Sequence, residues 1–310
     1  MSKRSEETIA FLNESQVRSV LDMNALIGTM GKALIDYSTG HYAQPDRQLL
    51  KVQKHGGFFA AMPAVGAGVG VKLVTFYPDN ATRGLHTHQA LIILFEPETG
   101  TPLVVMDGRL ITEMRTSAVS AAATQALAIP EARVLAVLGT GVLARTHIDA
   151  LSRVRQFDEI RVWGRSSEKA EKLAEEVGGR AMPAEAAVRD ADVVVTATAA
   201  KEPILMGRWL KPGAHVNAVG WNTNTGRELD DDAMKHVVIV ESRAGAASES
   251  GNIRVANATI HAEIGEVLAG RKPVDPSATT LFDSVGMAAE DVASAMLVWN
   301  AWQQGRGLSP

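Results

Sequence analysis

The segment "RVLAVLGTGVLARTHIDALSRV", residues 133–154, decides the fold of this chain. It begins with an apolar run typical of a buried strand and continues with apolar residues at helical spacing. Gly139 permits a tight turn between the two, Gly141 lets the backbone approach a pyrophosphate, and Ala144 lets the helix pack on the strand. The pattern predicts a dinucleotide-binding turn formed by Gly139, Thr140, Gly141, Val142, Leu143 and Ala144.

Strand and helix patterns alternate around this turn. EIRVWGR (159–165), DADVVVTAT (190–198), GAHVNAVG (213–220) and HVVIVES (236–242) are apolar runs of the kind that parallel sheets bury on both faces. The alternation predicts a Rossmann-type doubly wound parallel sheet from about residue 120 to 290.

The first third of the chain has a different rhythm. GVGVKLVTFYP (68–78), HQALIILFEP (88–97) and TPLVVMDG (101–108) are β-rich runs that follow one another without helical spacers. This order predicts an α+β domain with antiparallel strands. The predicted fold class is therefore α/β, with a Rossmann-type sheet and a second, α+β domain.

Composition restricts the partners. The chain has 310 residues with 31 basic and 35 acidic side chains, so its net charge of −4 gives no positive field for nucleic acid or anionic lipid. It has no cysteine, no apolar stretch long enough to span a membrane and no secretory signal at its start. We expect a cytoplasmic protein with a small-molecule partner.

The end of the second strand bears on cofactor choice, because a carboxylate there binds a ribose 2′-hydroxyl and a cation binds a 2′-phosphate. This strand ends in Trp163-Gly164-Arg165-Ser166-Ser167, with no acid before Glu168. The pattern favours NADP(H) held by Arg165, Ser166 and Ser167, with NAD(H) possible. The alternative is a surface arginine next to a serine N-cap.

Three cations precede the nucleotide-binding segment: Arg47, Lys72 and Arg115. Lys72 lies between Val71 and Leu73 in an otherwise apolar strand, where an ammonium group is costly to bury without a partner. A substrate carboxylate would be such a partner. Taken singly, each cation is also explained as a surface or snorkelling charge.

Several loops together resemble the ornithine cyclodeaminase/mu-crystallin family. The resemblance covers nearly the whole chain and rests on QPDR (44–47), VKLVTFYPDN (71–80), GLHTHQALIILFEPETGTPLVVMDG (84–108), LITEMRTSAVSA (110–121), LGTGVLA (138–144), GRELDDD (226–232), SESGNI (248–253) and LFDSVGMAAEDVA (281–293).

The resemblance implies a site and an assembly. Arg47, Lys72 and Arg115 would bind the carboxylate of an imino or amino acid. The implied cofactor contacts, beyond the glycine turn, are Thr116, Thr198, Val219, Ser284 and Gly286. It also implies a homodimer, in which residues 1–118 with 292–310 form a substrate-binding and dimerisation domain and residues 119–291 bind the dinucleotide.

Two departures from the family pattern affect the chemistry. Cyclodeaminases have an aspartate two residues after Gly220, where this chain has Asn222, and an amide cannot serve as a general base near neutral pH. His86 replaces a common proline and could protonate a substrate nitrogen. His86 and His88 lack a third ligand nearby in the sequence, so no metal site is expected.

These observations predict an NAD(P)H-dependent reductase or dehydrogenase that acts on the C=N bond of an imino acid or on the corresponding amino acid, with Lys72, Asn222 and His86 as catalytic residues. One alternative is an ornithine cyclodeaminase that releases ammonia to give proline, with Glu228 or His86 as a shifted base. Another is a non-catalytic NADPH- or ligand-binding protein of the mu-crystallin type.

The remaining polar residues have structural explanations. We expect Glu228 and Asp230 to Asp232 to favour the N-terminus of the next helix, and Asp283, Glu290 and Asp291 to be exposed or capping. His147 is expected to pack rather than to react.

Overall fold

The computed structural model describes residues 9–220 and 226–306. The chain comprises two compact units, and neither is one continuous segment. The first contains residues 1–22, 40–112 and 288–310, and the second contains residues 23–39 and 113–287. The helix at 23–39 thus belongs with the second unit, which differs from the predicted ranges 1–118 and 119–291. The roles assigned to those ranges stay predictions.

The first unit contains a six-stranded sheet in the order β1-β6-β5-β4-β3-β2. β1 pairs with β6 in parallel, and all the other neighbours are antiparallel, as predicted for this part of the chain. Its elements are β1 (Ala10–Leu12), α1 (Glu14–Val20), β2 (Gln48–Val52), η1 (Gln53–His55), β3 (Gly57–Val65), β4 (Val69–Phe76), η2 (Pro78–Arg83), β5 (His88–Phe95), β6 (Pro102–Asp107) and α10 (Ala288–Arg306).

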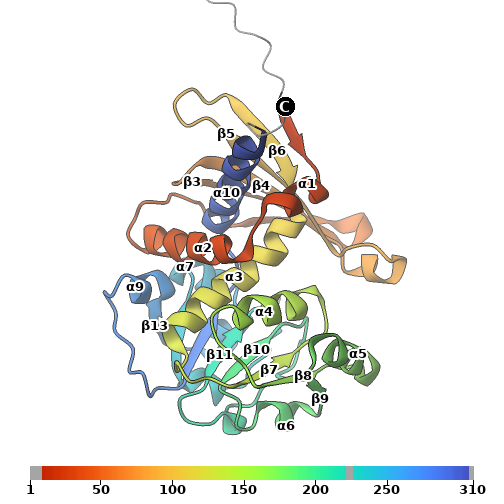
Figure 1. The fold of residues 1–310 in the computed structure, drawn as a ribbon, viewed down its shortest axis with the longest axis vertical. Helices are drawn as coiled ribbons and strands as arrows, with labels where there is room; N and C mark the ends of the chain where they lie inside the picture. The colour runs from red at the N-terminus through yellow and green to blue at the C-terminus, as the bar shows by residue number, and fades with distance from the viewer. Residues whose placement is uncertain (1–8, 221–225, 307–310) are drawn as a thin grey trace, which may run out of the picture. The chain divides into compact units, whose positions relative to one another are not determined.

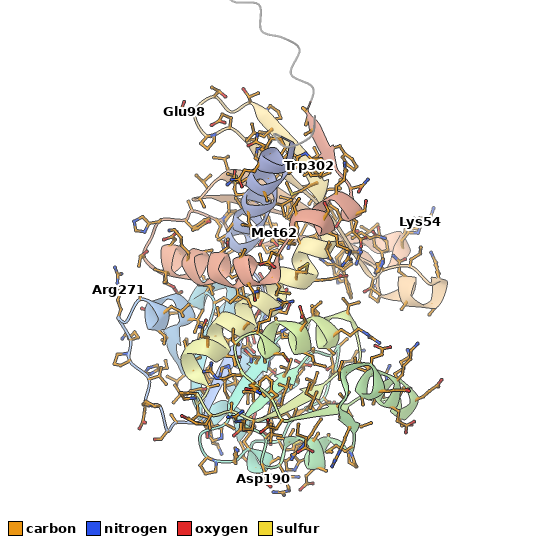
Figure 2. The ribbon with its side chains drawn as sticks, viewed as in Figure 1. Lys54, Met62, Glu98, Asp190, Arg271 and Trp302 are labelled. Carbon is orange, nitrogen blue, oxygen red and sulfur yellow. The ribbon has the colours of Figure 1, made fainter. Side chains whose placement is uncertain are left out.

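Alternation along the strands gives this sheet two different faces. Helix α10 lies across β3, β4 and β5 (Figure 1). The face that it covers includes the buried side chains of Met62, Lys72 and Ile92, which are paired across the strands. Met62 on β3 and Trp302 on α10 are labelled in Figure 2. Residues one position away in each strand point to the opposite face.

The second unit contains an eight-stranded parallel sheet in the order β13-β12-β14-β11-β10-β7-β8-β9. The predicted Rossmann-type sheet is therefore confirmed. Its elements are α2 (Met23–Ser38), most of α3 (Arg109–Leu127), β7 (Val134–Leu138), α4 (Val142–Ser152), β8 (Glu159–Trp163), α5 (Ser167–Val177), β9 (Arg180–Ala181), α6 (Ala184–Val188), β10 (Val193–Thr196), η3 (Gly207–Trp209), β11 (His215–Ala218), η4 (Ala233–Lys235), β12 (Val237–Val240), α7 (Arg243–Glu249), α8 (Gly251–Ala256), β13 (Ile260–Glu263), α9 (Ile264–Leu268) and β14 (Thr280–Asp283).

The strand order reverses at β7. From β7 the chain continues outward to β8 and β9, then returns to place β10 and β11 on the other side. Ligands of doubly wound sheets bind outside the carboxyl ends of the strands at such a switch point. The central strands are made of buried valine, leucine and alanine, which form one apolar core with residues from α6 and the following loops.

Helix α3 is joined to its neighbours in this unit by buried polar contacts. Thr124 Oγ1 accepts a hydrogen bond from Asn217 Nδ2 at 2.9 Å, and Ser120 Oγ lies 3.0 Å from His147 Nε2. His147 is fully buried on α4, its Nδ1 lies 2.6 Å from the carbonyl of Leu143, and burial lowers its pKa to about 4. The packing role predicted for His147 agrees with this position. No helix among the described residues is both long and apolar enough to cross a membrane.

Candidate active site

The turn between β7 and α4 has the geometry that the sequence predicts for a phosphate-binding turn. Gly139 has φ +144°, and a Cβ there would lie 2.6 Å from the carbonyl oxygen of Ala197. Gly141 has φ −83°, and a Cβ there would meet no heavy atom within 4 Å. Ala144 is fully buried. Only glycine fits the first position, whereas the second faces open space.

Helix α4 begins at this open space. Its N-cap is Gly141, which makes no side-chain cap hydrogen bond, so the first backbone N–H groups of the helix are available to an anion. Thr140 lies within the turn, and its carbonyl accepts a hydrogen bond from Arg145 Nη1 at 3.2 Å. Val142 is 42% exposed at the helix start.

The loop after β8 lies against this turn. Gly139 N donates to the carbonyl of Trp163 at 2.8 Å, and a Cβ on Gly164 would lie 2.5 Å from Thr140 Cγ2. Arg165 is exposed, and Ser166 is the N-cap of α5, where its side chain accepts a hydrogen bond from Lys169 N at 3.4 Å. The capping alternative for Ser166 is thus present, and the 2′-phosphate role of Arg165, Ser166 and Ser167 stays a prediction.

Glu228 joins the ends of β10 and β11. It is buried, with Oε1 accepting from Thr198 N (2.7 Å) and Thr198 Oγ1 (2.6 Å) and Oε2 accepting from Thr196 Oγ1 (2.8 Å) and Gly220 N (2.9 Å). Burial raises its pKa to about 7. The expectation that Glu228 favours a helix N-terminus is wrong, because its carboxylate lies inside the sheet edge. Asp230 has that role, since its Oδ1 accepts from Ala233 N at 2.8 Å.

A second carboxylate holds the loop after β14. Glu241, at the end of β12, accepts hydrogen bonds from Ser284 Oγ (2.5 Å), Val285 N (3.1 Å) and Gly286 N (2.7 Å). Asp283 is also buried, and its Oδ2 accepts a hydrogen bond from Asn252 Nδ2 at 2.8 Å. Burial is the main cause that raises its pKa to about 6. The expectation that Asp283 is exposed or capping is wrong, because β14 lies between β11 and β12 within the sheet.

Arg115 contacts this loop from α3. Gly286 has φ +79°, and a Cβ there would lie 2.6 Å from Arg115 Nη2. Arg115 and the following Thr116 are both buried. Of the predicted residues, Arg115 and Gly286 therefore lie against each other in the second unit, and Ser284 belongs to the same loop as Gly286.

The other predicted substrate residues belong to the first unit. Lys72 is 2% exposed in the middle of β4, and its Nζ lies 2.6 Å from Asp291 Oδ2 on α10. Asp291 and Glu290 lie in the first turn of α10 and both are fully buried, so the expectation that they are exposed is wrong. Lys72 thus has an acidic protein partner that the sequence did not reveal.

Arg47 and His86 lie at the ends of strands in the first unit. Arg47 is half-buried immediately before β2, and His86 is exposed in the turn that leads into β5, where its carbonyl accepts from Asn80 Nδ2 at 2.9 Å. Asn222 lies outside the described residues.

A model of the ornithine cyclodeaminase/mu-crystallin family matches residues 7–306. The chain belongs to this family. Rattus norvegicus ketimine reductase mu-crystallin is 44% identical over 308 residues, which cover 96% of this chain and 98% of that protein. The resemblance predicted from the loop motifs is therefore confirmed.

Two solved structures of similar proteins support the same fold. Thermococcus litoralis Delta(1)-pyrroline-2-carboxylate reductase, in complex with NADH and L-proline, is 33% identical with a TM-score of 0.91, covering 96% of this chain and 98% of that one. An archaeal alanine dehydrogenase dimer with bound NAD is 32% identical, also with a TM-score of 0.91, covering 96% and 97% of the two chains.

The buried acids Glu241 and Asp291 were not predicted as site residues, and Glu228 was considered only as the shifted base of the cyclodeaminase alternative. The sequence could have predicted a site role for Glu241, because this residue directly follows the apolar run VVIV and so lies at the carboxyl end of a buried strand. Asp291 carried no comparable signal, since its partner Lys72 is far away in the sequence.

Proposed function

We propose that this protein is an NAD(P)H-dependent reductase of the C=N bond of an imino acid, able to oxidise the corresponding amino acid in reverse. The observation that carries the proposal is the glycine turn at the switch point of the parallel sheet, in a chain 44% identical to a ketimine reductase. The Thermococcus litoralis relative, which holds NADH and L-proline, supports the same substrate class.

The residues present fit a dinucleotide. The open space at Gly141 and the uncapped start of α4 suit a pyrophosphate, and Thr116, Thr198, Val219, Ser284 and Gly286 would hold the nicotinamide half. When bound, the reduced cofactor supplies the hydride. We propose NADP(H) as the preferred form, because exposed Arg165 follows β8 where a carboxylate would select NAD(H).

The substrate carboxylate would be bound by Arg47, Lys72 and Arg115. This binding would hold the imine carbon in a fixed position, so that the reaction does not depend on a random encounter. Asp291 compensates the buried charge of Lys72 before the substrate arrives. The substrate nitrogen needs one proton and orientation, and we assign these tasks to Asn222 and His86.

Ornithine cyclodeamination with Glu228 as base is disfavoured by the geometry. Both oxygens of Glu228 accept hydrogen bonds from the protein itself, four in total, and the group is buried. A general base must reach a substrate proton, and this carboxylate is already engaged.

We also propose a homodimer in which the face of the six-stranded sheet opposite α10 meets a second copy. Phe11, Leu50, Val65 and Leu91 are 42–62% exposed, and the strand register places them on the face opposite Lys72. An apolar patch of this kind marks an interaction surface, and the archaeal alanine dehydrogenase relative is a dimer.

The test is NADPH and NADH oxidation with cyclic imino acids, including pyrroline-2-carboxylate, and with 2-oxo acids plus ammonium. Turnover with an imino acid is the expected result, with higher kcat/KM for NADPH. Absence of turnover over the whole panel, while NADPH binds, would overturn the reductase. Ammonia release from ornithine would then identify a cyclodeaminase, and binding alone would identify a ligand-binding protein.

A further inference from the structure

The carboxyl edge of the eight-stranded sheet holds the buried carboxyl group of Glu228, which carries a negative charge above its pKa of about 7. Among the described residues, its hydrogen bonds come from four uncharged donors: two threonine hydroxyls and two backbone N–H groups. Burial is the largest cause of its pKa shift and neutral hydrogen bonds are the others. Neutral donors satisfy the oxygens but leave the net charge of the ionised group in place.

This charge is fixed on the segments proposed to hold the nicotinamide. Oε1 is bound by Thr198 N and Oε2 by Gly220 N, the residue after Val219. The loop that begins at Ser284 is adjacent to the end of β11, since Ser284 N donates a hydrogen bond to the carbonyl of Ala218 at 2.9 Å. The adenosine half would lie on the other side of β7, near the end of β8.

The carboxylate cannot move away from this edge. A Cβ on Gly220 would lie 2.4 Å from Glu228 Oε1 and 2.3 Å from the carbonyl oxygen of Thr198, so the backbone already touches the carboxylate. On its other side, Glu228 N donates to Asn252 Oδ1 at 3.0 Å, and Asn252 Nδ2 donates to Asp283 Oδ2 at 2.8 Å. The position of the charge is therefore set by both its side chain and its backbone.

Glu241 provides an internal contrast. It also accepts hydrogen bonds from uncharged donors, but one of them, Gly286, lies against the guanidinium of Arg115. The cation offsets part of the charge of Glu241. Glu228 is thus the better candidate for an uncompensated charge.

A nicotinamide ring is cationic when oxidised and neutral when reduced. We propose that Glu228 is a positioning residue whose buried charge favours the oxidised cofactor and stabilises the positive charge that develops on the ring as hydride leaves. It acts through the field at the sheet edge and through the segments it holds, without touching the ring. The proposal rests on the proposed function, because it requires a cofactor at this edge.

The test compares the Kd of NADP+ with that of NADPH in Glu228→Gln, at a pH well above the pKa of about 7. Loss of one nearby charge at low effective dielectric weakens NADP+ binding about tenfold relative to NADPH. Glu228→Asp, which retains the charge, is expected to preserve the ratio. Thr196→Val removes one hydrogen-bond donor and keeps the carboxylate, so it should change both Kd values by the same factor.

Equal weakening of NADP+ and NADPH in Glu228→Gln would show a purely structural role and overturn the proposal. If Glu228→Gln does not fold, Asn252→Ala moves the charge instead, because Asn252 holds the backbone of Glu228, and an unchanged Kd ratio in Asn252→Ala would overturn the proposal. Failure of the unaltered protein to bind either cofactor would contradict the proposed function itself, a result distinct from a ratio that does not change.

Discussion

The two units bury charge in opposite ways. In the six-stranded sheet, Lys72 is paired with a full opposite charge on Asp291, at 2.6 Å. In the parallel sheet, Glu228 is matched by four neutral donors spread over two strand ends. An ion pair cancels its own field, whereas neutral donors hold a charge in place and leave its field intact.

The contrast has an energetic counterpart. Removing one member of a buried ion pair leaves the other with the full cost of desolvation. Removing one of several hydrogen bonds costs far less, because the remaining donors still solvate the group. The first unit should therefore be the more sensitive of the two to a single substitution at its buried charge.

Lys72→Met gives the largest expected effect. It removes the ammonium next to Asp291, which should lower the free energy of unfolding by about 3–5 kcal/mol and lower turnover by about a hundredfold or more. Urea unfolding and imino acid reduction measure the two effects.

A double variant separates the fold from the chemistry. Lys72→Met with Asp291→Leu replaces the pair by apolar groups, so stability should return while turnover does not. Recovery of turnover in the double variant would contradict the substrate role of Lys72.

Glu228→Gln should cost less, about 1–3 kcal/mol, because an amide cannot accept from donors on both of its heavy atoms. The cost should also depend on pH. The pKa of Glu228 is raised to about 7 from 4.5, so the folded protein binds more protons than the unfolded chain between these values, and wild-type stability contributed by this group falls as pH rises through the window.

The glutamine variant lacks this titration. Its deficit relative to wild type should therefore be largest below pH 4.5 and smallest above pH 7, as measured by urea unfolding across the range. A deficit that grows with pH would mean that the carboxylate is stabilised, rather than destabilised, by its buried site.

Gly286→Ala tests the position of Arg115, the cation that offsets part of the charge of Glu241. The new Cβ would lie 2.6 Å from Arg115 Nη2 at a positive φ, so Arg115 must shift and KM for the imino acid should rise about tenfold. Gly270→Ala is the matched control, since Gly270 has a similar φ of +70° but a Cβ there meets nothing within 4 Å. The control should lose about 1 kcal/mol of stability and keep its KM. An equal rise of KM in both variants would exclude the contact with Arg115 as the cause.

Arg165→Ser should have the smallest effect, because Arg165 is exposed and its charge is screened by water. We expect the ratio of kcat/KM for NADPH to that for NADH to fall about threefold to tenfold, with no change in stability. An unchanged ratio would contradict the role of Arg165 in binding a 2′-phosphate and would identify it as an ordinary surface charge.

The parallel sheet could be predicted from the sequence because its strands are continuous apolar runs and its cofactor turn has a fixed spacing. Strand β3 was harder to predict, since its core sequence Ala60-Ala61-Met62-Pro63 lacks β-branched residues. Pro63 is tolerated there because β2 pairs with β3 only from Gly57 to Ala61.

The candidate site was predictable where chemistry is local in sequence and not where it depends on distant pairing. The steric need for glycine at position 139 was predictable and is seen in the structure, whereas the role of Gly141 in approaching a pyrophosphate stays a prediction. The partner of Lys72 could not be inferred, because Asp291 reaches it only when α10 packs on the sheet. Glu228 looked like one of several acids before a helix, and its burial depends on neighbouring strand ends.

The order of the segments along the chain has a consequence for biosynthesis. The first unit is built from segments on both sides of residues 113–287, and α10 is synthesised only after those residues. Until then the apolar face of the six-stranded sheet, with the ammonium of Lys72 in its middle, lacks the packing of α10 on β3, β4 and β5. Folding of this unit during translation must therefore wait for the last segment, which makes the nascent sheet a natural client for chaperones.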